Sequence, residues 1–254
     1  MMNSVYEHLL QVREKRGGGF LLLLDPDSVP ENKCLDLAEA AADCGVDALL
    51  VGTSFVLTVD FTRSVRKIKE RTSLPVIIFP GSYAQVTPDA DAVLFSSLIS
   101  GRNPNYLIDE QVKGAPLIKK YGIEPISTGY MLIESGPLTS VQYISGTMPI
   151  PRSKSDIARA HALAAQYLGM KLVYLEGGSG AKQPVPTAMV ADVASYVDIP
   201  VLVGGGLTEA EQCAERIRAG AAFIVVGNKF EDDKQFIHLQ ELTGATHPRE
   251  TIKI

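Results

Sequence analysis

Short runs of apolar residues recur along the chain, each bounded by glycine, proline or an acidic residue. The runs are continuous rather than alternating, which is typical of parallel strands that are covered on both faces of their sheet. Amphipathic segments separate most of them, so strand and helix alternate. Eight strands are predicted, at residues 20–25, 47–51, 75–79, 92–95, 125–133, 171–176, 200–204 and 222–227.

This alternation predicts an α/β fold in which the strands close into a TIM, or (β/α)8, barrel. The chain has 254 residues, close to the ~250 typical of such a barrel, so we expect one domain over residues 1–254. Helices are predicted at residues 5–16, 31–44, 58–72, 105–121, 155–169, 186–197, 208–219 and 230–239.

One helix of this barrel is expected to be lost or reduced to a turn. Residues 80–90, between the third and fourth strands, include Pro80, Gly81 and Pro88. A parallel crossover usually needs a dozen or more residues, so a full helix hardly fits. The gap would be covered by another element or subunit, or would form a groove for a long apolar ligand. Side chains that could line this groove or simply pack there are Phe79, Tyr83, Phe95 and Tyr130.

A second irregularity is the insertion at residues 136–152, which has the length of an active-site lid. It follows the fifth predicted strand, at the end of the barrel where such enzymes carry their catalytic residues. The polar segment at residues 243–254 is expected to be a tail.

Composition narrows the classes of function. With 46% hydrophobic and 21% charged residues, the chain is neither disordered nor fibrous. A net charge of −5 without a basic run argues against nucleic-acid binding. The apolar run at residues 20–24 is far shorter than the ~20 residues that cross a membrane, so no stable membrane insertion is expected. Since Cys34, Cys44 and Cys213 fit no metal or disulfide spacing, we expect reduced thiols in a cytoplasmic enzyme.

Three glycine clusters follow predicted strands directly, at residues 177–180, 204–206 and 227–228. Glycine lets backbone N–H groups approach an anion closely, and TIM barrels commonly bind phosphate in the loops after strands 7 and 8. Glu176 lies beside the first cluster, where a carboxylate would repel a phosphate unless it served as a base. Tyr174 points to the same side of its strand and either orients a hydroxyl or packs in the barrel.

The ends of the first two strands carry candidate metal ligands. Asp25 and Asp27 follow the first strand, and Thr53 and Ser54 follow the second. Asp25 with one neutral oxygen suits Mg²⁺, which takes one or two carboxylates and leaves its other positions to phosphates and water. The alternative is that these side chains only cap the helices that follow. His8, His161, His238 and His247 are expected at the surface, which argues against a zinc site or a histidine-based triad.

Taken together, these motifs resemble one enzyme family. The segments 24–27, 52–54, 79–82, 96–104, 174–180, 204–206 and 227–228 are similar to the geranylgeranylglyceryl phosphate synthase, or PcrB-like, family, and to its group II. The resemblance spans nearly the whole chain and implies a modified TIM barrel with an irregular third helix. It also implies a prenyltransferase that joins geranylgeranyl diphosphate to the 3-hydroxyl of sn-glycerol 1-phosphate and releases diphosphate. This reaction makes the first ether bond of archaeal-type lipids.

The resemblance further implies roles for individual residues. Asp25 and Ser54 become the Mg²⁺ contacts, and Glu176, with Tyr174, holds and deprotonates the attacking hydroxyl. Leu23 departs from the pattern, because many relatives carry a lysine there that would face the phosphates. The family also implies a homo-oligomer, a dimer or larger. The implied glycerol-phosphate site comprises Tyr174, Leu175, Glu176, Gly177, Gly178, Ser179, Gly180, Gly205, Gly206, Gly227 and Asn228.

Three other functions are compatible with parts of the sequence. A sugar-phosphate isomerase or aldolase shares the barrel, but a Schiff-base aldolase needs a lysine inside it, and Lys171 lies at the wrong end of its strand. A noncatalytic phosphoglycerol-binding barrel would not need Asp25, Ser54 and Glu176 together. The same chemistry with another donor, such as heptaprenyl diphosphate, differs only at the end of the prenyl groove.

Overall fold

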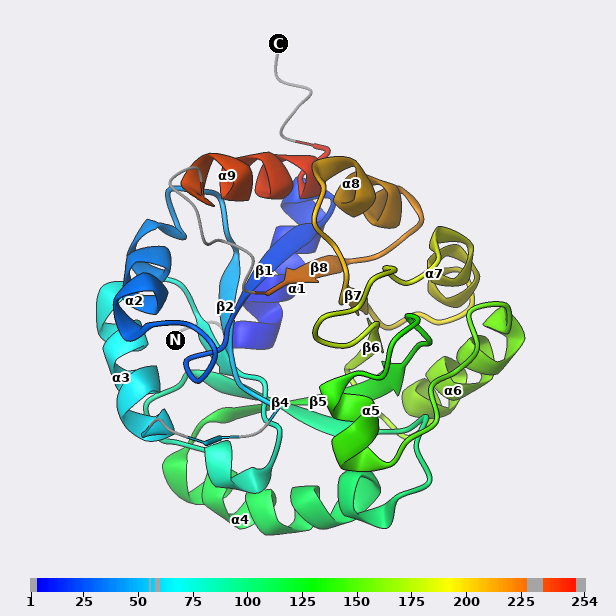
Figure 1. Ribbon diagram of the computed structural model, residues 1–254, viewed down its shortest axis with the longest axis horizontal. Helices are drawn as coiled ribbons and strands as arrows, with labels where there is room; N and C mark the ends of the chain where they lie inside the picture. Colours follow the sequence, from blue (N-terminus) through cyan, green and yellow to red (C-terminus); the bar gives the residue numbers. More distant parts are fainter. Residues whose placement is uncertain (1–3, 55, 58–59, 228–234, 250–254) are drawn as a thin grey trace.

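The computed structural model describes residues 4–54, 56–57, 60–227 and 235–249. Eight parallel strands form a closed barrel in chain order, and β1 pairs with both β2 and β8 (Figure 1). This arrangement confirms the predicted TIM-type fold, with each strand within three residues of its expected bounds. The strands are β1 Gly19–Leu24, β2 Ala48–Val51, β3 Val76–Ile78, β4 Ala92–Leu98, β5 Glu124–Leu132, β6 Leu172–Glu176, β7 Val201–Gly204 and β8 Phe223–Val226.

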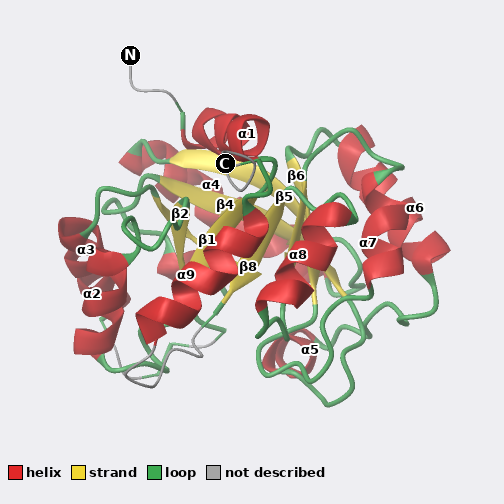
Figure 2. Ribbon diagram, turned by 90° about the horizontal axis from the view of Figure 1, so that it is seen from above, coloured by secondary structure: helices red, strands yellow, loops and turns green. Residues whose placement is uncertain are grey.

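Helices surround the barrel, and α1 lies at the end of the barrel where the strands begin (Figures 1 and 2). Ser4 caps α1 by accepting a hydrogen bond from the Glu7 N–H at 3.1 Å, and Leu9 and Val12 on its buried face pack against the barrel interior. The α-helices are α1 Val5–Arg16, α2 Glu31–Ala40, α3 Phe61–Arg71, α4 Glu110–Tyr121, α5 Ser140–Ser145, α6 Ser155–Tyr167, α7 Thr187–Ala194, α8 Ala210–Arg218 and α9 Gln235–Thr246.

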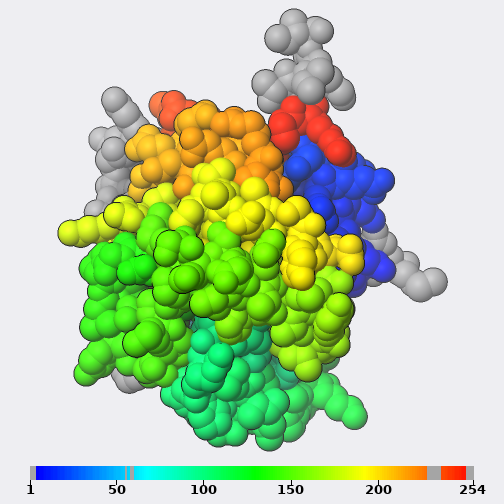
Figure 3. All heavy atoms as spheres, turned by 90° about the vertical axis from the view of Figure 1, so that its right-hand side faces the viewer, coloured from blue at the N-terminus to red at the C-terminus, as the bar shows by residue number. Residues whose placement is uncertain are grey.

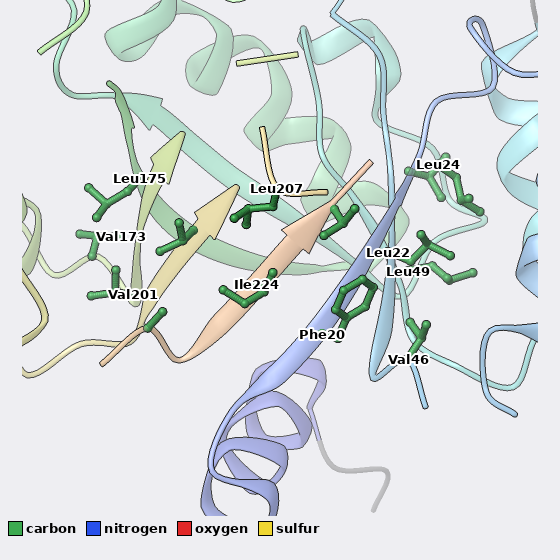
Figure 4. Packing of buried hydrophobic residues seen from close by; sticks show 14 of the residues in the cluster. Phe20, Leu22, Leu24, Val46, Leu49, Val173, Leu175, Val201, Leu207 and Ile224 are labelled. Carbon is green, nitrogen blue, oxygen red and sulfur yellow. The ribbon is translucent and has the colours of Figure 1, made fainter. Parts of the chain in front are cut away.

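Each strand separates two apolar cores. Along β1, Leu21 points into the barrel, whereas Leu22 and Leu24 point outward to the helices. Figure 4 shows part of the outer core, in which Leu22 lies near Leu49. Because both faces of every strand are buried, the continuous apolar runs of the sequence fit this sheet.

The crossover between β3 and β4 confirms the expected loss of a helix. It contains only the 3₁₀ turn η1, Tyr83–Gln85. The loops after β2 and β3 pack backbone against backbone: a Cβ on Gly52 would lie 1.8 Å from the Phe79 carbonyl oxygen. The Gln85 side chain joins them by donating to the Thr53 carbonyl at 2.8 Å and accepting from the Gly81 N–H at 3.0 Å. The position of the loop after β2 therefore depends on Gln85 of η1, the short turn that replaces the expected helix.

The insertion after β5 is fixed at its base and contains a helix, where the sequence predicted only a loop. The Ile150 N–H donates to the Leu132 carbonyl at 2.8 Å, and the Glu134 N–H donates to the Ile150 carbonyl at 2.9 Å. Helix α5 lies between these two ends. The Asn103 side chain, from the loop after β4, donates to the Ser145 carbonyl at the end of α5 at 2.8 Å. The insertion is thus attached to two neighbouring strands.

The other end of the barrel holds a buried ionic cluster that the sequence did not predict. Asp47 accepts hydrogen bonds from the Phe20 N–H at 2.7 Å and from Arg16 Nη1 at 2.7 Å, and its Oδ2 lies 2.9 Å from His247 Nε2. His8 Nε2 lies 3.1 Å from the Asp47 carbonyl oxygen. His247 is only 3% exposed, so its expected surface position is wrong, as is a polar tail that begins at residue 243 within α9.

Replacing Asp47 with alanine is expected to lower the free energy of unfolding by about 3–5 kcal/mol, as measured by urea denaturation. Removing one partner of a buried ion pair leaves the other charge without compensation, which is the reason for this magnitude. Asp43→Ala, at an exposed site four residues earlier, is the matched control and should change stability by less than about 0.5 kcal/mol. Similar losses in the two variants would show that the cluster contributes little.

Candidate active site

A cavity of about 480 Å³ opens at the C-terminal end of the barrel. Residues from the ends of all eight strands or the loops after them contribute to it, as expected for the catalytic face of a TIM barrel. The cavity has two parts. One lies over the barrel mouth, and the other continues outside β4, between η1 and α4, where the missing helix would stand.

Three aromatic rings form a cluster within the barrel mouth. The ring centroids of Phe79 and Tyr130 are 5.8 Å apart, and Tyr174 lies 5.4 Å from each. All three side chains line the cavity, as do Tyr83 and Phe95. The four side chains proposed from sequence for the groove therefore all reach the cavity. The cluster gives the site an apolar base beneath its polar rim.

Glu176 is the only acidic side chain of β6, and it points into the barrel mouth. Its Oε1 accepts a hydrogen bond from the Gly178 N–H at 2.6 Å, which fixes the carboxyl group. Burial raises the pKa of Glu176 above its usual value, although the nearby Tyr174 hydroxyl and the hydrogen bond from the Gly178 N–H act in the opposite direction. A carboxylate with a raised pKa is a stronger base, and general bases work best when their pKa approaches the working pH.

Tyr174 stands beside Glu176 on the same face of β6. Burial, together with the nearby Glu176 charge, raises the pKa of Tyr174 well above its usual value, so the phenol stays protonated at neutral pH. The hydroxyl is close enough to Glu176 for each group to shift the pKa of the other. Within the described part of the chain, however, no atom forms a hydrogen bond with this hydroxyl. A buried hydroxyl without a partner favours a ligand that supplies one.

Glycines with positive φ line the rim next to Glu176. Gly178, Gly180, Gly205 and Gly206 have φ values of 94°, 76°, 83° and 73°, a region that side chains other than glycine rarely adopt. Gly205 is also confined, because a Cβ there would lie 2.5 Å from Glu176 Oε1. Loops of this kind present backbone N–H groups to anions. The structure therefore brings the first two glycine clusters together around Glu176.

Replacing Gly205 with alanine is expected to raise the KM for a phosphorylated acceptor by about tenfold. The new methyl group would strain a positive-φ backbone and press on Glu176, and about 1–2 kcal/mol of strain corresponds to roughly a tenfold effect. Gly122→Ala is the control: it has φ 71° at the end of α4, with no atom within 4 Å of its would-be Cβ. Steady-state kinetics should give a higher KM for Gly205→Ala than for Gly122→Ala. Equal KM values would show that Gly205 is not part of the binding site.

The remaining residues predicted from sequence fall into three groups. Ser179 and Gly227 line the cavity together with the residues already described. Leu175 points outward into the core beneath the helices, and the Gly177 N–H donates to the Gly204 carbonyl at 3.0 Å, so neither residue lines the cavity. Asn228 lies outside the described residues. Leu23, where the resemblance implies a lysine in other members, also lines the cavity.

Asp25 and Ser54 both line the cavity. Asp25 also stabilises its own turn, because Oδ1 accepts from the Asp27 N–H at 3.0 Å and Oδ2 accepts from the Ser28 hydroxyl at 2.9 Å. The capping alternative is wrong, because α2 begins after Pro30 without a side-chain cap and Asp60 caps α3, so Asp25 stabilises the turn after β1 instead. The described residues contain no cluster of three or more His, Cys, Asp or Glu side chains that could hold a metal. One carboxylate and neutral oxygens fit Mg²⁺, whose other positions phosphates and water can fill, and do not fit zinc.

Sequence reasoning missed the α4 wall of the cavity. Gln111, Gly114 and Ile118 line it from successive turns of one helix face. The spacing of three and four residues was a usable signal, but glycine and glutamine do not mark an apolar stripe. It also missed Val141 and Ile144, which α5 contributes from the insertion.

Comparison with known proteins places this site in a family. The sequence matches the model of the PcrB family over residues 10–244. The chain belongs to the PcrB family. It is 43% identical over 247 residues to geranylgeranylglyceryl phosphate synthase of Chitinophaga pinensis, with 97% of each chain covered. Its identity to the synthase of Thermococcus kodakarensis is 46% over 229 residues, covering 90% of this chain and 89% of the relative.

Solved structures agree with this PcrB-family membership. The (S)-3-O-geranylgeranylglyceryl phosphate synthase of Thermoplasma acidophilum, determined in complex with its substrate sn-glycerol-1-phosphate, is 34% identical and superposes with a TM-score of 0.89. The alignment covers 97% of this chain and 100% of that one. Thiamine phosphate pyrophosphorylase of Pyrococcus furiosus, at 13% identity and a TM-score of 0.60, shares the fold alone. The resemblance of the motifs is thus confirmed at the level of the family and its fold.

Proposed function

We propose that this PcrB-family protein is a prenyltransferase that joins geranylgeranyl diphosphate to the 3-hydroxyl of sn-glycerol 1-phosphate and releases diphosphate. The observation that supports it most is the position of Glu176, a buried base between a rim of glycine loops and a cavity that continues into an apolar flank. The names of the relatives and the acceptor bound in the Thermoplasma acidophilum enzyme agree with this reaction.

The acceptor side of the reaction uses the rim next to β6. The N–H groups at Ser179–Gly180 and Gly205–Gly206 hold the phosphate, which fixes the glycerol over Glu176, while the Gly178 N–H holds the Glu176 carboxyl group. Glu176 accepts the proton of the 3-hydroxyl as that oxygen attacks the allylic carbon. The Tyr174 hydroxyl donates to a glycerol oxygen and so orients the nucleophile. Positioning of this kind can supply up to ~7–11 kcal/mol of rate enhancement.

The donor side uses the opposite rim and the flank. Asp25 and Ser54 would hold Mg²⁺, which neutralises charge on the departing diphosphate. The rings of Phe79, Tyr130 and Tyr174 lie beneath the reacting carbon, where their π-faces stabilise the positive charge that develops as the C–O bond breaks. The apolar tail of the donor enters the flank between η1 and α4.

Association into a homo-oligomer is a further part of the proposal. Large apolar side chains are exposed on two faces: Leu138, Tyr143 and Met148 around α5, and Tyr167, Leu168 and Tyr196 on the α6–α7 side that Figure 3 shows in green and yellow. Exposed apolar patches commonly mark interfaces. No helix in the described ranges is long and apolar enough to cross a membrane. The cytoplasmic location expected from the sequence stays a prediction.

A mass-resolved assay tests the proposal. Purified protein with Mg²⁺ is offered sn-glycerol 1-phosphate or its 3-phosphate enantiomer, together with prenyl diphosphates of fifteen, twenty and thirty-five carbons. The expected result is a twenty-carbon ether formed only with the 1-phosphate. A thirty-five-carbon ether would keep the mechanism and change the donor to heptaprenyl diphosphate. Absence of product with every donor would contradict the proposal and favour a sugar-phosphate enzyme on the same barrel.

A further inference from the structure

The loop after β6 continues past its glycines as a supporting segment, residues 181–185, which packs against the glycine loop after β7. A Cβ on Gly206 would lie only 3.0 Å from the Pro184 nitrogen and 3.1 Å from the Ala181 carbonyl oxygen, so the two backbones are in direct contact. Ala181 and Gly206 line the cavity, whereas Pro184 and Val185 do not. The position of Gly206 at the rim therefore depends on where the supporting segment lies.

Two arginine side chains hold the supporting segment in place. Arg152, at the end of the insertion after β5, donates from Nη2 to the Pro184 carbonyl at 2.9 Å. Arg216 of α8 donates from Nε and Nη2 to the Val185 carbonyl at 3.2 and 3.1 Å. Both carbonyls precede α7, which begins at Thr187, so they lie outside regular helix and strand. Two consecutive carbonyl groups are thus fixed by two guanidinium groups from other parts of the chain.

Arg152 also joins the supporting segment to the base of the insertion. Its Nη1 donates to the Glu134 carbonyl at 3.0 Å, and its backbone N–H donates to Glu134 Oε2 at 3.3 Å. The other end of the insertion reaches the first glycine loop, because a Cβ on Gly178 would lie 2.7 Å from Thr139 Cγ2. Figure 1 shows α5 beside the loop after β6. The insertion therefore contacts this loop at two points, with Thr139 against Gly178 and Arg152 on Pro184.

We propose that Arg152 is a positioning residue of the acceptor site: it holds the supporting segment so that the glycine loops present their N–H groups to the phosphate. The inference rests on the proposed prenyl transfer to glycerol phosphate. Arg152 does not line the cavity, so it acts through Pro184 and Gly206 rather than on the ligand itself. A binding loop must be held within about 0.5 Å of its productive geometry, and charged hydrogen bonds from a neighbouring element provide this precision.

The test measures the kinetic constants of an Arg152→Ala variant for each substrate. The KM for sn-glycerol 1-phosphate should rise by about tenfold, the effect of losing one charged hydrogen bond. The KM for the prenyl diphosphate and kcat should stay within about threefold of their original values, because the donor side and Glu176 are unchanged. Arg152→Lys, which can donate to only one of the two carbonyls, should give an intermediate KM. Added methylguanidinium should lower the acceptor KM of the alanine variant toward the original.

Arg159→Ala is the matched control. This arginine lies on α6, 5.0 Å from the centre of the Tyr196 ring and outside the cavity lining, so its loss should change neither KM.

An unchanged acceptor KM in Arg152→Ala would overturn the inference. A lower kcat with both KM values unchanged would overturn it too, because a merely structural role reduces the folded fraction alone. If the alanine variant does not fold, Arg152→Lys is judged by the same two criteria. These outcomes would leave prenyl transfer itself standing. Failure of the unaltered protein to bind or convert sn-glycerol 1-phosphate would instead contradict the proposed function, and the inference with it.

Discussion

Replacing Glu176 with glutamine is expected to lower kcat by about 10²–10⁴-fold, the range that a positioned general base contributes. Glutamine has nearly the same shape and can still accept the hydrogen bond that Gly178 donates at 2.6 Å, so the loop should keep its conformation. It cannot take the proton of the attacking hydroxyl. The measurement is single-turnover kinetics at saturating substrates. A kcat within about threefold of the original would show that Glu176 does not act as the general base.

The pH dependence of the Glu176 variant provides a second, independent readout. Burial raises the folded-state pKa of Glu176 above its unfolded value, so protonation favours the folded state. This stabilisation is present at low pH and is lost as the pH rises through the folded pKa. The gain in Tm from Glu176→Gln should therefore be larger at pH 8 than at pH 4. The acid limb of kcat/KM should also disappear in the variant. A gain that is larger at pH 4 would contradict a buried, raised-pKa carboxyl group.

Replacing Asp25 with asparagine is expected to lower kcat/KM by about 10²-fold or more at a fixed Mg²⁺ concentration. Metal stabilisation of departing charge is worth several kcal/mol, and each 1.36 kcal/mol is a factor of ten. Asparagine keeps an oxygen acceptor for the Asp27 and Ser28 N–H groups, so the turn after β1 should persist. Calorimetry of prenyl diphosphate binding, with and without Mg²⁺, should show that the metal-dependent part is lost.

Asp27→Asn is the matched control for Asp25. Asp27 Oδ2 accepts from the Leu57 N–H at 3.1 Å, and the side chain is not part of the cavity lining. Its replacement removes the same charge two residues away and keeps an acceptor, so metal-dependent binding should persist. Equal effects of the two variants would indicate that general charge, rather than a metal ligand, matters at this end of β1. Unchanged metal-dependent binding in Asp25→Asn would limit the role of Asp25 to its hydrogen bonds within the turn after β1.

The strands and the missing helix were predictable because both follow from local sequence. Continuous apolar runs mark strands buried on both faces, and a short crossover with two prolines and a glycine has no room for a helix. The last helix was predicted less well. Its C-terminal part reads as polar, but His247 and Thr243 are buried by contacts with Asp47 and Cys44, about 200 residues away. Such long-range pairing leaves no local pattern.

The site was predictable where residue type alone carries the chemistry. Glu176, Asp25 and the glycines could be selected because carboxylates and positive-φ turns have few structural reasons to gather at strand ends. The α4 wall could not be found in this way, because Gln111, Gly114 and Ile118 share no chemistry that their residue types would announce. The hydrogen-bond geometry of Tyr174 was also out of reach, since it depends on how β6 and β7 pack: a Cβ on Gly204 would lie 2.4 Å from the Tyr174 hydroxyl.

A crystal structure with sn-glycerol 1-phosphate, Mg²⁺ and an unreactive twenty-carbon diphosphate analogue tests the central claim most directly. The expected result is a phosphate about 2.7–3.2 Å from backbone N–H groups of the loops after β6 and β7, with the 3-hydroxyl on Glu176. The prenyl chain should pass the aromatic cluster and lie between η1 and α4, beside Gly114. A phosphate bound away from these loops, or a prenyl chain outside the flank, would contradict the claim.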